Sequence, residues 1–298
     1  MQWYDANLVQ LQSVMVYILL GLSLQVVLRA GIFSMASIGF FGVGAYGAAI
    51  LANDGHNVVI SVGVPVVVGF VGGALLALVV VKLRGLYLGL VTLAFTLILS
   101  VLEGNGGELT GGAIGLYGIP QLAPMPLLVS VVLVVILLVS QLQRGGVGRS
   151  LDILRLNEDL ARSLGFDPIR RRNLLMSLSS GLGALAGSLH VLCVSYVSPG
   201  TADFGLVVVG LTLIVVGGMN SWVGAIVGAV FVVWLPVTMG STIGPWGNLI
   251  FGAAVVLVAT FAPDGIVGIV SRLVAFIRKT WLTGEAYGSG RRLSWPRS

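Results

Sequence analysis

The sequence contains very few charged residues. Only 9% of its 298 residues are Asp, Glu, Lys or Arg, whereas an average soluble domain has about 25%. A water-facing surface needs roughly 25–35% charged residues to stay soluble and free of large apolar patches. Because 57% of the residues are hydrophobic and the mean hydropathy is +1.04, we expect an integral membrane protein.

Motifs for catalysis are missing as well. One cysteine, Cys193, cannot form an internal disulfide or a thiolate metal cluster. His56 and His190 are far apart and form no His-Glu-x-x-His zinc motif. The one Lys-Thr pair, Lys279-Thr280, lacks the preceding glycine of a phosphate-binding loop. We therefore expect no catalytic residue, metal or cofactor, and predict that the chain is not an enzyme.

Long apolar runs dominate the rest of the chain. A helix needs about 20 residues to cross a bilayer, and residues 131–139 are apolar at every position, which favours helices over the alternating strands of a β-barrel. We predict an all-α polytopic transmembrane bundle of about nine spans within residues 1–270. The segments are 8–28, 32–52, 58–81, 86–102, 126–142, 174–196, 204–219, 222–240 and 246–262.

Basic residues predict the orientation, because Lys and Arg concentrate in cytoplasmic loops. All 16 fall in pieces that nine crossings would put on one side: the turns at Arg29, 82–85 and Asn220, the loop 143–173 and the end of the chain. The other side carries carboxylates and no basic residue. We expect the N-terminus outside, the C-terminus inside and residues 271–298 to form a cytoplasmic basic tail. The outer carboxylates are Asp5, Asp54, Glu103, Glu108 and Asp203.

Glycine is abundant, at 43 residues, about twice the average share. Gly183 with Gly187, and Gly224 with Gly228, are small residues four positions apart, which favour close approach of membrane helices. We expect such glycines to serve packing. The second span is different, because its glycines are dense enough to bend or break a helix beside a cavity. These are Gly39, Gly42, Gly44 and Gly47.

The fourth span carries polar residues along one helical face, at i, i+3, i+4, i+7, i+8 and i+11. Its hydroxyls could bond a polar solute, or each could bond the preceding turn of its own helix; both readings stay open. The stripe is Thr92, Phe95, Thr96, Leu99, Ser100 and Glu103.

Ion coupling is disfavoured. Carboxylates buried in spans are the usual proton or sodium sites, and we place every Asp and Glu in a turn, loop or tail, with Glu103 just beyond the fourth span. A self-contained channel or secondary carrier remains an alternative.

Two loops deserve separate interpretation. The loop 104–120 has seven glycines and suits either an exposed linker or a re-entrant or docking loop. In the loop 143–173 we predict a short amphipathic helix over residues 148–165, followed by re-entry at Asp167-Pro168. Acidic residues in the middle of that helix favour a protein partner over a lipid surface.

The order and spacing of several motifs resemble the permease subunits of bacterial branched-chain amino acid ABC transporters of the LivM type. The resemblance extends to about Val270. The motifs are Gly42-Val43-Gly44-Ala45-Tyr46, Leu83-Arg84-Gly85-Leu86-Tyr87, Val91-Thr92-Leu93-Ala94-Phe95, Thr110-Gly111-Gly112 with Gly115-Leu116, Leu164-Gly165, Ser198-Pro199, Gly217-Gly218 and Phe261-Ala262-Pro263.

This resemblance implies an importer that works with two ATP-binding subunits, a second homologous permease subunit and an extracytoplasmic substrate-binding protein, in the bacterial cytoplasmic (inner) membrane. ATP would bind to the partners, membrane lipid would surround the chain, and no nucleic acid is involved. The cytoplasmic helix would couple to the ATPase through Glu158, Asp159, Ala161 and Gly165. For the substrate pathway we select Ser34, Phe40, Tyr46, Thr92, Phe95 and Thr96.

Departures from the family pattern leave the solute open. The family often has Gly-His where this chain has Ala36-Ser37, and Asp264 stands where a basic residue is usual. Branched-chain or other hydrophobic amino acids are the expected substrates. Urea or a related small polar solute is the alternative within the same family.

Overall fold

The computed structural model describes residues 7–143, 148, 151, 153, 155, 162–163, 165, 167–219, 221–243, 247–261 and 265–268. Helices account for most of them, as predicted. The elements are α2 (Leu8–Arg29), α3 (Ala36–Asn53), α4 (Val58–Val79), α5 (Gly85–Gly104), η1 (Gly107–Leu109), β1 (Leu116–Tyr117), α6 (Met125–Leu142), α9 (Pro168–Val194), β2 (Tyr196–Val197), η2 (Pro199–Ala202), α10 (Phe204–Gly217), α11 (Trp222–Ile243) and α12 (Gly247–Phe261).

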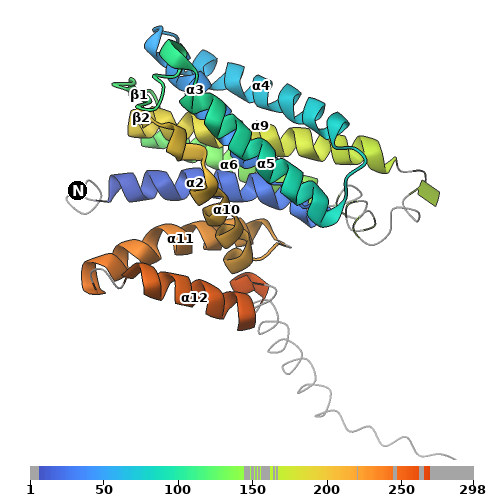
Figure 1. The fold of residues 1–298 in the computed structure, drawn as a ribbon. Coiled ribbons are helices and arrows are strands. Elements are labelled where there is room, and N and C mark those ends of the chain that lie inside the picture. The colour runs from blue at the N-terminus through green and yellow to red at the C-terminus, as the bar shows by residue number, and fades with distance from the viewer. Residues whose placement is uncertain are drawn as a thin grey trace, which may run out of the picture.

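Helix α9 is the centre of the bundle. It packs against α2, α3 and α4, while α5 packs on α3 and α6 packs on α2. Helices α10 and α11 contact the opposite side of α2, and α12 packs on α11 (Figure 1). The apolar stretches of α2, α3 and α9 are mostly buried inside the bundle, whereas those of α4, α5 and α6 are mostly not buried.

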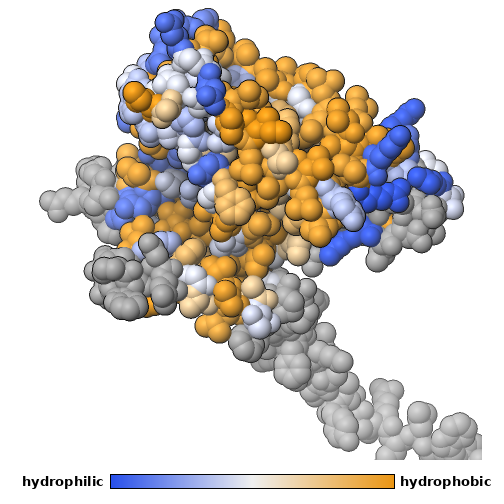
Figure 2. All heavy atoms as spheres, viewed as in Figure 1, coloured by the Kyte–Doolittle hydropathy of each residue, from blue (hydrophilic) through white to orange (hydrophobic). Residues whose placement is uncertain are grey.

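The exposed surface of α4 and α5 is apolar. Large side chains such as Val67, Leu75, Leu90 and Ile98 are 54–61% exposed. Figure 2 shows hydrophobic residues across the middle of this face and hydrophilic residues gathered at its two ends. A band of this kind matches the hydrocarbon core and the two headgroup regions of a bilayer.

Seven helical stretches are long and apolar enough to cross a membrane, counting η2 together with α10. Helices α11 and α12 carry shorter apolar stretches, Trp222–Thr238 and Ile250–Thr260. Each of the nine predicted segments therefore coincides with a helix, and the chain is a multi-pass helical membrane protein. Nine crossings and the orientation stay predictions.

One end of the bundle gathers the connections that carry the basic residues. The side chain of Arg155 lies against Gly31, just after α2. Arg172 donates hydrogen bonds to the backbone carbonyls of Val80 (3.2 Å) and Leu83, after α4. These contacts bring together the connections that follow α2, α4 and α6. Every second connection lies at the same end of a bundle when each helix runs from one end to the other. We call this the basic end.

The opposite end gathers the remaining connections. Strands β1 and β2 form an antiparallel pair in which Leu116 lies opposite Val197, and the rings of Tyr117 and Tyr196 stack at 4.8 Å. The glycine-rich loop 104–120 is therefore docked on the chain that follows α9, not left as a free linker. We call this the acidic end.

Helix α3 contradicts the expected break in the second span, since it runs unbroken from Ala36 to Asn53. Its glycines allow three neighbouring helices to approach: Gly39 faces Thr96 of α5, Gly44 faces Ala184 of α9, and Gly47 faces Pro65 of α4. Packing on several sides stabilises the helix despite the low helix propensity of glycine. The irregular backbone lies just before α3, at residues 32–35.

Glycine pairs make the closest helix contacts, as predicted. A Cβ atom at Gly183 or Gly187 would collide with the carbonyl oxygens of Ser37 and Phe41 on α3. The hydroxyl of Ser188 adds a hydrogen bond to the carbonyl oxygen of Gly44 (3.0 Å). Gly224 and Gly228 make the same kind of contact between α11 and α10.

The α3–α9 contact yields a stability prediction. Gly187→Val should force the two helices apart and destabilise the protein by about 1–3 kcal/mol, the usual cost of overpacking. Thermal unfolding of the detergent-solubilised protein measures this. Gly252→Val in α12 is the matched control, because no atom lies within 4 Å of a Cβ atom placed there. Equal melting temperatures for the two variants would refute the contact.

Candidate functional site

The predicted polar stripe of α5 faces α3. We call this contact, from residues 32–46 to Thr92–Glu103, the seam. At its basic half the backbone N–H of Met35 donates to Thr92 Oγ1 (3.0 Å), and Thr96 Oγ1 donates to the carbonyl oxygen of Met35 (3.2 Å). Both threonines have no exposed surface. Thr92 thereby pairs the N–H of Met35 where the chain enters α3, and Thr96 adds a second donor to the Met35 carbonyl, which also accepts from the N–H of Ile38 (3.1 Å).

The same hydroxyls also bond their own helix. Thr92 Oγ1 lies 2.9 Å from the carbonyl oxygen of Leu88, and Thr96 Oγ1 lies 3.0 Å from that of Thr92. Both readings of the stripe are thus represented. The Thr92 hydroxyl donates to its own helix while it accepts from Met35, and the single O–H of Thr96 is shared between the carbonyl oxygens of Thr92 and Met35. Ser100 differs, because its hydroxyl donates to the carbonyl oxygen of Pro199 in η2 (2.9 Å).

Aromatic and serine residues complete the middle of the seam. The rings of Phe40 and Phe95 lie 5.5 Å apart, and Phe40 also touches α4 at Gly72. Ser34 is buried and its hydroxyl accepts a hydrogen bond from the backbone N–H of Ala36 (3.3 Å). The structure therefore brings together most of the predicted pathway residues on two facing segments. Their role in transport stays a prediction.

Glu103 is the main correction to the sequence analysis. It lies inside α5, which continues to Gly104, and it is only 7% exposed. Neither carboxylate oxygen has a hydrogen-bond partner among the described residues. The prediction that every carboxylate lies in a turn, loop or tail was wrong for Glu103. Apolar periodicity marks the end of a hydrophobic run and not the end of the helix.

Glu103 faces α3 at a glycine. A Cβ atom at Gly42 would meet the carboxylate of Glu103 and lie 2.8 Å from Ala202 Cβ in η2. Tyr46 follows Gly42 by one helical turn and is 5% exposed. Its hydroxyl has no hydrogen-bond partner in the described part of the chain.

The seam is closed in this structure. Thr92 and Thr96 are fully buried in its middle, and η2 covers its acidic end through Ala202 and Pro199. Element η2 is itself fixed by a capping box between Ser198 and Thr201. A solute could pass along this line of polar groups only after α3 and α5 separate.

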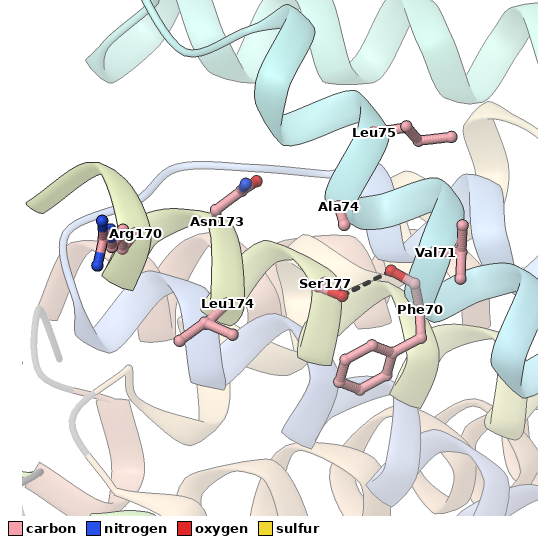
Figure 3. A pocket seen from close by; sticks show the side chains of 8 residues that line it. All are labelled: Phe70, Val71, Ala74, Leu75, Arg170, Asn173, Leu174 and Ser177. Carbon is pink, nitrogen blue, oxygen red and sulfur yellow. Dashed lines mark hydrogen bonds between the residues drawn. The ribbon is translucent and has the colours of Figure 1, made fainter.

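An open groove of about 540 Å³ lies elsewhere, between α4 and α9. Figure 3 shows its apolar wall from Phe70 to Leu75, with Arg170 and Asn173 at one end. The hydroxyl of Ser177 donates to the carbonyl oxygen of Phe70 (2.6 Å). This groove contains none of the predicted pathway residues and opens on the apolar outer surface.

The predicted ATPase-coupling residues are placed only in part. Glu158, Asp159 and Ala161 lie outside the described residues. Gly165 is exposed, has a left-handed backbone (φ +81°) and, among the described residues, has no neighbour within 4 Å of a Cβ position. The φ value explains why glycine suits this place, because other residues pay a steric cost there.

A buried glutamine near the loop 143–173 was also missed. Gln25 of α2 has no exposed surface. Its amide accepts a hydrogen bond from Gln143 Nε2 (2.6 Å) and donates one to the carbonyl oxygen of Met219 (3.3 Å). The start of the loop is thereby tied to α2 and to the turn after α10. A lone polar residue in an apolar run was the available signal for Gln25, as a carboxylate at a span end was for Glu103.

Known proteins are similar to this sequence over most of its length. Residues 9–259 match the family described as branched-chain amino acid transport system, permease component. The chain belongs to this permease family. The high-affinity branched-chain amino acid transport system permease proteins LivM of Salmonella typhimurium (strain LT2) and Escherichia coli (strain K12) are each 30% identical over 289 residues, covering 85% of this chain and 68% of the relative.

The family confirms the resemblance drawn from the motifs. Its members are transport components and not enzymes, which agrees with the expected lack of catalytic function. No solved structure matches this permease significantly. The arrangement of the seam therefore rests on the geometry described above.

The hydrogen bonds at Met35 yield a prediction. Thr92→Val keeps the shape of the side chain but leaves the buried N–H of Met35 without an acceptor, which costs about 1–3 kcal/mol. We expect a lower melting temperature and weaker uptake. Thr92→Ser, which keeps the hydroxyl, should behave nearly as wild type, and so should Ser130→Ala, because the Ser130 hydroxyl is exposed on α6 and bonds only Leu127 of its own helix. Indistinguishable Val and Ser variants would contradict the assignment.

Proposed function

We propose that this chain is the transmembrane permease subunit of an ATP-binding-cassette importer for branched-chain or other hydrophobic amino acids in the bacterial cytoplasmic membrane. Family membership over residues 9–259 is the observation that carries the proposal. The two LivM relatives are branched-chain amino acid permease proteins, which supports the substrate class. The chain holds no cofactor in this scheme, since ATP binds to separate subunits.

The solute would cross between α3 and α5. The seam supports this route because it is the contact that lines up hydroxyls, aromatic rings and a carboxylate from one end of the bundle to the other. Separation of the two helices would expose Thr92 and Thr96, whose hydroxyls could then exchange backbone partners for a solute. Only interactions that differ between the closed and open packings can shift that equilibrium.

Coupling would begin at the basic end. Arg155, in the loop 143–173, packs on Gly31, with its Cγ 3.2 Å from a Cβ position there. Gly31 leads directly into residues 32–35, whose last member is held by Thr92 and Thr96. A motor that displaces the loop would therefore pull on the backbone that enters the seam. This supports an ATP-binding partner docked on the loop.

Other partners follow from the same scheme. Two ATP-binding subunits and a second homologous permease would complete the membrane complex, and an extracytoplasmic binding protein would deliver the solute at the acidic end. The exposed arginines at the basic end, such as Arg170, support a cytoplasmic orientation for that end.

Gly165 provides a test of the docking site. Because no described residue lies within 4 Å of a Cβ atom placed there, Gly165→Trp should leave this chain folded but block a docked ATPase, so that the ATPase no longer co-purifies and ATP-dependent uptake of leucine is lost. Gly55→Trp is a matched control, since Gly55 has nearly the same backbone (φ +80°) and equally empty surroundings but lies in another loop. Its complex should retain the ATPase. Normal ATPase binding and uptake by Gly165→Trp would refute the docking assignment.

A further inference from the structure

Glu103 is a buried carboxylate in the last turn of α5, a helix long and apolar enough to cross a membrane. It is 7% exposed, and neither oxygen is hydrogen-bonded to a described residue. Buried polar groups in proteins are almost always paired, and an unpaired charge is costly to keep away from water. Ionisable residues within spans are for this reason rare and are usually functional.

No basic residue pairs with it in the described part of the chain. Elements α3, α5 and η2 belong to chain segments 30–81, 85–143 and 173–271, which contain no Lys or Arg. The ring of His190 of α9 lies 5.5 Å from that of Phe41, and Glu103 accepts no hydrogen bond from it. A cationic ligand would supply the positive charge that these segments lack.

A second unpaired oxygen lies in the same region. The hydroxyl of Tyr46 is buried without a partner in the described structure, one turn beyond the glycine that faces Glu103. The two carboxylate oxygens and this hydroxyl make three acceptors. A primary ammonium group has three N–H donors and one positive charge. Its donors match the three acceptor oxygens in number, and its charge complements the carboxylate.

We propose that Glu103 and Tyr46 form a subsite at the acidic end of the seam that binds the ammonium group of a zwitterionic solute. Gly42 lets the carboxylate pack against the backbone of α3, because a Cβ atom there would meet Glu103. In the closed seam the carboxylate fills this space, and the ammonium group would reach it once α3 and α5 separate. The subsite lies under η2, at the end where the proposed function has the binding protein deliver its solute, and it rests on that function. Through this subsite the permease would itself contact the ammonium group that amino acid solutes have in common.

The test uses the complete transporter in proteoliposomes, with radiolabelled L-leucine outside in complex with the binding protein. Glu103→Gln should lower the uptake rate about 10-fold or more, because a charge-assisted contact is lost. Tyr46→Phe should lower it by a smaller factor. Glu108→Gln, on an exposed carboxylate near the same end, should transport as wild type does. Uptake by Glu103→Gln within twofold of wild type would overturn the subsite.

Stability separates a binding role from a structural one. Because Glu103 has no partner in the described structure, Glu103→Gln should leave the melting temperature unchanged or raise it. A clear fall in melting temperature would instead show that the carboxylate supports the fold, and would overturn the inference.

Two comparisons identify the ligand. Replacing Na⁺ by K⁺ should not change uptake, and a loss of uptake would assign the carboxylate to sodium and contradict the proposal. A wild-type transporter that carries urea and not leucine would refute the proposed function itself. A wild type that carries leucine, with an equally active Glu103→Gln variant, would refute the subsite alone.

Discussion

The pairing of backbone groups inside the membrane constrains this structure more than any other interaction. Water is absent from the hydrocarbon core, so an irregular segment persists there only if protein groups satisfy it. Residues 32–35 are an irregular and mostly buried segment between α2 and α3, and Thr92 and Thr96 bond Met35 from the facing helix. The two threonines thus fix the register of α3 against α5 and, with it, the meeting of Phe40 with Phe95 and of Gly42 with Glu103.

The seam links events at both ends of the bundle. Arg155 packs on the turn that leads into it at the basic end, and η2 covers it at the acidic end. Close packing of α3 on α9 leaves that interface little freedom, whereas the α3–α5 contact is made of hydroxyls that can change partners. In the proposed function the ATPase therefore acts on the α3–α5 contact, whose hydroxyls exchange hydrogen-bond partners more easily than the α3–α9 contact rearranges.

Sequence patterns predicted much of this arrangement. Apolar runs predicted the nine helices to within a few residues, except for the start of α9. This helix begins at Pro168, where Asp167 caps it, and includes three arginines that hydropathy assigns to a loop. The stripe on α5 was predictable from spacing alone. Its partner was not, because pairing of Thr92 and Thr96 with the backbone of Met35 joins residues about 60 positions apart. Glycine density misled for a similar reason: low propensity predicts a break, but packing on three neighbours outweighs it. Glu103 was misplaced because the helix continues two residues beyond its apolar run, to Gly104.

Cross-linking tests most directly whether α3 and α5 must separate. With Cys193, the single cysteine, replaced by Ala, a Phe40→Cys/Phe95→Cys variant in the reconstituted transporter would be assayed for leucine uptake before oxidation, after oxidation and after reduction. A Phe231→Cys/Phe251→Cys variant, at rings 6.3 Å apart between α11 and α12, is the control. Oxidation should stop uptake reversibly in the seam variant and leave the control active. Undiminished uptake through a fully cross-linked seam would contradict the account.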